Sequence, residues 1–75
     1  MLDANTVRLR LLAAFPGAAV EVTDLTGTSD HFKAEVAARE FVGKSRIEQH
    51  KMVYAALGEW MSGAIHALAL TTRTL

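Results

Sequence analysis

The clearest strand pattern in this 75-residue sequence is Phe32-Lys33-Ala34-Glu35-Val36-Ala37-Ala38. Every second residue from Phe32 onward is apolar, whereas Lys33 and Glu35 on the opposite face are charged. This alternation predicts a β-strand with one buried face. Residues 19–25 are rich in β-branched types and predict another strand, and the turn-forming residues 26–30 join the two. The two strands should therefore form an antiparallel hairpin.

A helical pattern precedes this hairpin. Its apolar residues, at spacings of four, three and one, are Val7, Leu11, Ala14 and Phe15. Asp3 or Asn5 can cap the helix, because their side chains accept hydrogen bonds from its first backbone N–H groups. Pro16-Gly17 should end it, since proline cannot continue the helical hydrogen-bond ladder.

Another helix and a third strand follow the hairpin. Ser45 and Glu48 form an S-x-x-E capping box, which predicts a helix over about residues 46–62 that Gly63 terminates. The expected buried face of this helix comprises Ile47, Val53, Tyr54, Leu57, Trp60 and Met61. Residues 65–72 are apolar or small on both faces, as expected of a strand that is covered on both sides or central in a sheet.

The resulting order, α-β-β-α-β, predicts a single α+β domain over residues 1–75, with a three-stranded mixed sheet and the helices packed on one face. The second strand, the long helix and the third strand form a β-α-β unit, whose strands run parallel when they share a sheet. Parallel neighbours begin at the same edge of the sheet. His31 precedes the second strand and His66 lies at the start of the third, so the two histidines should share that edge.

This shared edge makes His31 and His66 a candidate metal-binding pair, because imidazole is the commonest metal ligand. Two histidines do not close a tetrahedral site. The chain has no cysteine, so any thiolates would have to come from a partner. An iron–sulfur centre with two imidazoles on one iron is chemically sound. The plainer alternative is that His31 is solvated in a polar turn and that His66 is an edge or half-buried histidine whose ring has its hydrogen bonds satisfied.

Basic residues near the start of the second helix form a candidate anion site. Gly43 and Lys44 lead into the helix, and Arg46 and Lys51 follow in its first turns, so the group could bind a phosphate backbone. The alternative is a solvated basic face. Across the whole chain 8 Lys and Arg balance 8 Asp and Glu, whereas a general nucleic-acid-binding protein usually has a basic excess. His50, within this helix, is expected to have a structural or solvated role.

No arrangement of residues typical of an enzyme is recognisable. Ser45 is better explained as a helix cap than as a nucleophile, the carboxylates are scattered, and no Gly-rich phosphate loop is present. No stretch approaches the roughly 18 apolar residues of a membrane span, and residues 1–10 lack the pattern of a signal peptide. We therefore expect a cytoplasmic protein that binds rather than catalyses and does not associate with membranes.

Three segments together resemble the BolA-like family, namely Phe41-Val42-Gly43-Lys44-Ser45, Glu48-Gln49-His50-Lys51-Met52-Val53-Tyr54 and Ile65-His66-Ala67-Leu68-Ala69-Leu70-Thr71-Thr72. The Asp30-His31-Phe32 turn is similar to the family subtype that has histidine in this loop. The resemblance implies a class II KH-like fold and a monothiol glutaredoxin partner, with which the chain shares a glutathione-ligated [2Fe–2S] cluster. It further implies that His66 is one cluster ligand and His31 the second, with no cofactor tightly bound to the isolated chain.

The resemblance also implies an alternative, because some family members are transcriptional regulators. A KH module clamps nucleic acid with a G-x-x-G loop. The matching segment, Gly43-Lys44-Ser45-Arg46, lacks the second glycine, which weakens this alternative. Many relatives continue past the position of Leu75 with a Pro-containing segment and a last helix. If that last helix normally covers part of the sheet, its absence would leave apolar surface exposed and favour self-association. We therefore expect the chain alone to be a monomer or a weak homodimer.

Overall fold

A computed structural model of the chain describes residues 2–75. Its elements, in order, are α1 (Ala4–Ala14), β1 (Ala19–Asp24), β2 (His31–Ala38), the 3₁₀ helix η1 (Arg39–Phe41), α2 (Arg46–Leu57), the 3₁₀ helix η2 (Gly58–Ser62) and β3 (Ala67–Thr74). The strands form one sheet in the order β1-β2-β3. β2 pairs antiparallel with β1 and parallel with β3, which confirms the predicted hairpin, the β-α-β unit and the mixed sheet.

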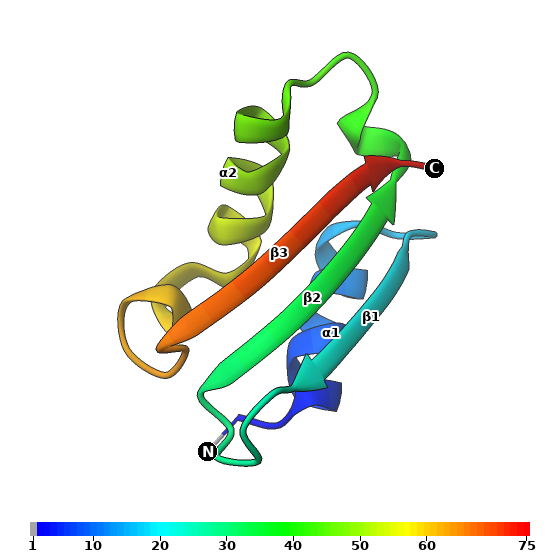
Figure 1. Cartoon of the computed structure of the whole chain (residues 1–75). Helices are drawn as coiled ribbons and strands as arrows, with labels where there is room; N and C mark the ends of the chain where they lie inside the picture. The colour runs from blue at the N-terminus through cyan, green and yellow to red at the C-terminus, as the bar shows by residue number, and fades with distance from the viewer. Residues whose placement is uncertain (1) are drawn as a thin grey trace.

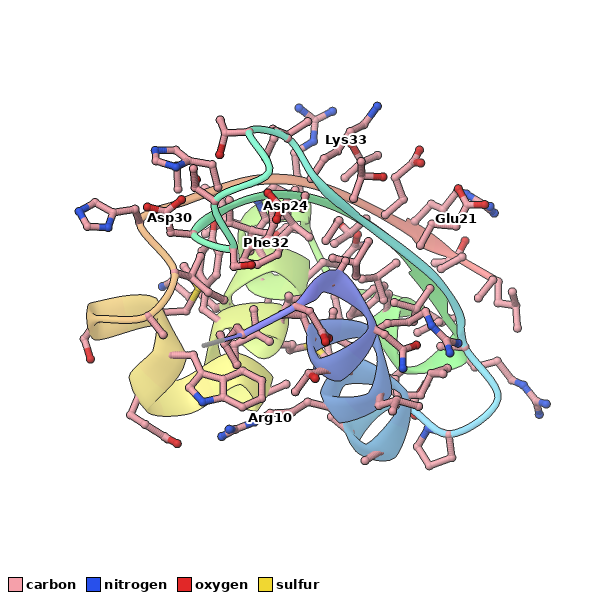
Figure 2. All side chains as sticks on the ribbon, turned by 90° about the horizontal axis from the view of Figure 1, so that it is seen from below. Arg10, Glu21, Asp24, Asp30, Phe32 and Lys33 are labelled. Carbon is pink, nitrogen blue, oxygen red and sulfur yellow. The ribbon has the colours of Figure 1, made fainter. Side chains whose placement is uncertain are left out.

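Both helices lie against one face of the sheet, and the other face is open (Figure 1). An end-on view shows Phe32 pointing toward the helices, whereas Glu21 and Lys33 project from the open face (Figure 2). The alternation seen in the sequence of β2 therefore corresponds to its two faces. The α+β fold with its helices on one face is as predicted.

The hydrophobic core fills the space between the sheet and the helices. β2 contributes its whole inward face, and the fully buried residues of the helical layer come from both long helices and from η1. The large side chains that are completely buried are Val7, Leu11, Phe32, Val36, Phe41, Val53 and Leu57. The rings of Phe15 and Phe41 meet at 5.3 Å between centroids and an angle of 60°, which joins the end of α1 to η1. Ala14 was expected on the buried stripe of α1 but is exposed.

The buried face of α2 differs from the one predicted. Gln49, Val53 and Leu57 face the core, whereas Ile47 is 68% exposed and Tyr54 is 38% exposed. Gln49 occupies a core position because its side-chain amide donates hydrogen bonds to the carbonyl oxygens of Phe41 at 3.4 Å and Lys44 at 3.0 Å. These bonds satisfy the backbone of the connector before α2, so a polar residue stands where the apolar pattern expected a hydrophobic one.

The end of α2 also differs from the prediction. The helix stops at Leu57, and Gly58 caps it with a φ of 57°, a left-handed conformation that suits glycine. The chain then continues as η2 up to Ser62 instead of as α-helix. Trp60, in η2, is half-buried beneath the guanidinium of Arg10, which lies 4.1 Å from the ring centroid. Arg10 therefore ties α1 to the segment after α2.

β3 is an edge strand, which corrects the expectation that residues 65–72 are central or covered on both faces. The strand begins at Ala67, and every second residue from there lies on the open face of the sheet. The side chains at these positions are small or polar and can face solvent at little cost. The alanines among them were therefore no sign that this face of the strand is buried. Among residues 2–75, no helix is long and apolar enough to cross a lipid bilayer.

The orientation of α2 can be tested by comparing one residue on each face. Leu57→Ala should lower the free energy of unfolding by about 2–5 kcal/mol, because it opens a cavity in the core. Ile47→Ala should change it by less than about 0.5 kcal/mol, because Ile47 is exposed. Urea unfolding followed by circular dichroism gives both values. A larger loss for Ile47→Ala than for Leu57→Ala would contradict this orientation.

Candidate functional site

The structure brings His31 and His66 together at one edge of the sheet. His31 is the first residue of β2 and pairs in register with Ala67, the first residue of β3, so His66 lies directly before that strand. The two imidazole rings are 5.9 Å apart between centroids, and their planes differ by only 18°. The predicted shared edge is therefore confirmed, although the two residues are distant in sequence.

Both rings are open to solvent. The side chain of His31 is 41% exposed and that of His66 is 73% exposed. An exposed pair of imidazoles on a rigid edge can be reached by a partner molecule without unfolding of this chain. Of the two plainer alternatives for His66, an edge position or a half-buried one, the structure shows the edge position, because β3 is an edge strand and the ring before it is exposed.

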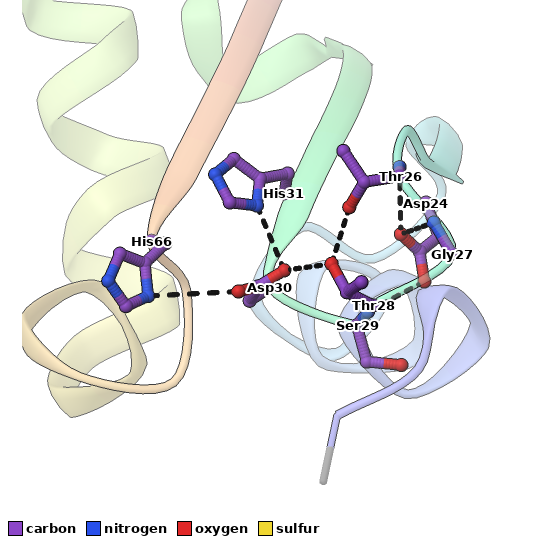
Figure 3. A network of polar contacts seen from close by, with 8 residues as sticks. All are labelled: Asp24, Thr26, Gly27, Thr28, Ser29, Asp30, His31 and His66. Carbon is purple, nitrogen blue, oxygen red and sulfur yellow. Dashed lines mark hydrogen bonds and ion pairs between the residues drawn. The ribbon is translucent and has the colours of Figure 1, made fainter.

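Asp30 contacts both histidines through the two oxygens of its carboxylate (Figure 3). Oδ1 lies 2.9 Å from Nδ1 of His31, and Oδ2 lies 3.8 Å from Nδ1 of His66. The backbone carbonyl of Asp30 also accepts hydrogen bonds from the N–H groups of His66 at 2.7 Å and Ala67 at 3.2 Å. One residue thus fastens the loop before β2 to the start of β3.

The carboxylate of Asp30 is held in its ionised form. A hydrogen bond from the hydroxyl of Thr28 makes the largest contribution to lowering the pKa of Asp30 below its ordinary value, and the hydrogen bond with His31 adds to it. Positive charge on His31 or His66 lowers this pKa further. At neutral pH the carboxylate can only accept hydrogen bonds, so it favours a proton on the ring nitrogens that face it.

Asp24 shapes the loop that carries Asp30. Its Oδ1 accepts the backbone N–H groups of Thr26 at 3.3 Å and Gly27 at 3.0 Å, and its Oδ2 accepts that of Ser29 at 2.9 Å. Hydroxyl contacts continue from Thr26 through Thr28 to Asp30 (Figure 3). The loop is therefore ordered by its own polar side chains before any partner binds.

Two histidines are not a complete metal site. Within residues 2–75, no group of three or more His, Cys, Asp or Glu side chains is placed to hold a metal ion. The chemistry of the donors nevertheless fits a metal, because two adjacent imidazoles present Nε2 atoms that point away from Asp30 (Figure 3). Metal-bound histidines usually donate their other ring N–H to a carboxylate, which is the role that Asp30 can fill.

The basic residues of the alternative site lie at the other end of the sheet, where α2 begins (Figure 1). Lys44, Arg46 and Lys51 are exposed, and Gly43 has a φ of 77° in the connector. The start of α2 is already occupied, because Glu48 accepts the backbone N–H of Ser45 at 2.8 Å within the confirmed capping box. This bond lowers the pKa of Glu48, so a carboxylate stands where an anion would bind.

His50 is half-buried on α2 and packs edge-on against Tyr54, with ring centroids 6.2 Å apart. This contact agrees with its predicted structural role. Asp24 and Asp30 were not singled out from the sequence as parts of the site. The adjacency of Asp30 to His31 was visible there, but the contacts with His66 depend on the parallel pairing of β2 and β3.

Three comparisons with known proteins identify relatives of the chain. The model of the BolA family, described as BolA-like protein, matches residues 13–75. An uncharacterised protein of Rickettsia prowazekii is 34% identical over 71 residues, which cover 95% of this chain and 92% of that protein. The DNA-binding transcriptional regulator BolA of Escherichia coli is 33% identical over 82 residues, covering 100% of this chain and 78% of the relative.

A similar fold is found among solved structures. The crystal structure of a Bol-like protein from Babesia bovis superposes with a TM-score of 0.86 at 27% identity. The match covers 99% of this chain and 86% of the other.

The role of Asp24 in the loop predicts a specific pattern of amide exchange. Asp24→Ala should speed hydrogen exchange at Thr26, Gly27 and Ser29 by roughly tenfold, because all three amides lose their acceptor. Asp24→Asn should speed exchange mainly at Ser29, since the amide keeps one oxygen for the other two. Exchange of the Val36 amide, in β2, serves as the control. Equal protection in the wild type and in Asp24→Ala would contradict this role.

Proposed function

This chain belongs to the BolA-like protein family, and from that premise we propose that it is an adaptor that binds a monothiol glutaredoxin and contributes His66 and His31 as ligands to a shared [2Fe–2S] cluster. In this proposal the cluster is cargo for iron–sulfur trafficking or iron sensing. The glutaredoxin and its bound glutathione supply the remaining thiolate ligands.

The observation that supports the proposal is the pair of exposed, nearly parallel imidazoles at one edge of the sheet. The ring centroids are 5.9 Å apart, so both imidazoles lie within reach of one metal centre brought to this edge, once the side chains turn toward it. The chain has no cysteine and so contributes no thiolate, and the ligands that we propose for it are the neutral imidazole nitrogens of His31 and His66. The backbone that carries the two histidines is already ordered, which lowers the entropic cost of binding a partner and its cluster.

The replacement of thiolate by imidazole has a chemical consequence. Histidine ligands raise the reduction potential of a [2Fe–2S] centre, as in Rieske proteins. An adaptor that exchanges thiolates for its own histidines would therefore change both the potential of the cargo and its readiness to leave the glutaredoxin. His66, which is more exposed than His31, is the residue that a partner reaches more easily.

The proposal predicts how single substitutions affect cluster sharing. The wild-type chain, titrated into a cluster-loaded monothiol glutaredoxin dimer, should produce a new visible circular dichroism spectrum. His66→Ala should abolish the new spectrum, and His31→Ala should weaken it, because each removes one nitrogen ligand.

His50→Ala is the matched control for these titrations. It also removes one histidine, but His50 lies on α2 against Tyr54 and is not part of the pair at the sheet edge. It should behave as the wild type does. An unchanged spectrum for His66→Ala would contradict the proposed ligand role, and the absence of any new spectrum with the wild type would exclude cluster sharing with that glutaredoxin.

A second candidate function is nucleic-acid binding. The relative from Escherichia coli is named a DNA-binding transcriptional regulator, and the exposed Lys44, Arg46 and Lys51 could contact phosphates near the turn at Gly43. The zero net charge and the carboxylate of Glu48 at the start of α2 oppose this function. For these reasons it ranks below the adaptor role.

The second candidate makes a prediction that depends on salt. If duplex DNA binds at this end of the molecule, Lys44→Ala with Lys51→Ala should weaken binding and reduce the slope of log affinity against log salt concentration by about 2, roughly 1 for each lost phosphate contact. Lys33→Ala removes a charge from the open face of the sheet and should have little effect. Fluorescence anisotropy over a series of salt concentrations measures the affinity of all three proteins, and no binding by the wild type at the lowest salt would exclude this function.

A further inference from the structure

We infer that Asp30 is a positioning residue for the histidine pair: its carboxylate orients both imidazoles so that their Nε2 atoms face outward for metal binding. This inference rests on the proposed function, because it concerns how the same two histidines are prepared for a shared cluster. Asp30 itself does not contact the cluster in this arrangement.

Asp30 contacts the histidine pair through both its carboxylate and its backbone carbonyl. Its two carboxylate oxygens face the Nδ1 atoms of two different histidines, at 2.9 Å for His31 and 3.8 Å for His66. Its backbone carbonyl holds the N–H of His66 at 2.7 Å. Thr28 and His31 contact the same carboxylate oxygen, Oδ1, which limits rotation of the carboxylate.

The hydrogen bond with Asp30 selects one tautomer of the neutral His31 ring, and the nearby carboxylate favours the same tautomer of His66. An ionised carboxylate accepts hydrogen bonds but cannot donate them, so a neutral imidazole beside it carries its proton on Nδ1. The lone pair then lies on Nε2, the nitrogen that points away from Asp30 (Figure 3). A free histidine side chain favours the opposite tautomer, whose Nε2 is protonated and cannot bind a metal until the proton moves.

The two histidines are held to different degrees. The distance of 2.9 Å places His31 in a direct hydrogen bond. The distance of 3.8 Å places His66 just beyond one, and its ring is the more exposed of the two. Asp30 therefore fixes His31 firmly and guides His66, whose ring keeps freedom to turn toward a partner.

Substitution of Asp30 can separate its side chain from its backbone. The carbonyl that holds His66 belongs to the main chain, so it remains in Asp30→Ala and Asp30→Asn. Asp30→Ala removes both acceptors that face the rings. Asp30→Asn keeps the shape and one acceptor but places an N–H donor toward the other ring, which should drive that ring into the Nε2–H form. Glu35→Gln removes one negative charge from the exposed face of β2 and is the matched control.

The first measurement uses the free protein and needs no cluster. Nitrogen-15 NMR of the imidazoles in alkaline buffer, where both rings are neutral, reports the tautomer of each histidine. The Nδ1–H form should dominate for His31 in the wild type and in Glu35→Gln. Asp30→Ala should shift His31 toward the Nε2–H form, and Asp30→Asn should do so for at least one ring. The same tautomers in the wild type and in Asp30→Ala would overturn the inference.

The second measurement links the tautomer to the shared cluster. In the circular dichroism titration with cluster-loaded glutaredoxin, Asp30→Ala should need about a 10- to 100-fold higher concentration than the wild type, which is the usual cost of losing a carboxylate behind a metal-bound histidine. A titration of Asp30→Ala that matches the wild type would overturn the positioning role while the adaptor function stands. No new spectrum with the wild type would overturn the adaptor function and the positioning role together.

Discussion

The parallel pairing of β2 with β3 is the interaction on which the rest of this structure depends. Because parallel strands begin at the same end of a sheet, the pairing places His66 beside His31. It also requires a crossover between the strands, and α2 with its flanking 3₁₀ helices supplies it on the face where the core forms. The same hydrogen-bond ladder therefore builds the core and brings the two histidines together.

The small size of the chain explains why its candidate sites lie at the edges of the sheet. A domain of this length has a single thin core, made by the inward face of β2 and the two long helices, and little volume for a deep cleft. At the edge where β2 and β3 begin, the polar loop before β2 is hydrogen-bonded to the start of β3. Asp24 orders that loop with three backbone hydrogen bonds, and Asp30 connects it to the histidines, so the exposed rings rest on a well-defined support.

The two ends of α2 differ in electrostatic character. Near its start, exposed basic side chains surround a capping box whose carboxylate already occupies the helix terminus. Near its end, η2 leads to the histidine pair, where one carboxylate faces two imidazoles. The first end could attract an anion, and the second is suited to a cation or a metal. The histidine edge and the basic end, which we propose for different functions, therefore lie at opposite ends of α2.

The sequence by itself determined the features that depend on neighbouring residues. The alternation in β2, the capping box of Ser45 and Glu48 and the caps around α1 are local, so the element order and the α+β class could be predicted, and the handedness of β-α-β units extended this to the shared histidine edge. The tertiary structure alone decided which residues meet across the chain. Gln49 faces the core because it satisfies the carbonyls of Phe41 and Lys44. Asp30 reaches His66 only because the strands are paired. Such contacts join residues far apart in the chain, and no periodic pattern in the sequence records them.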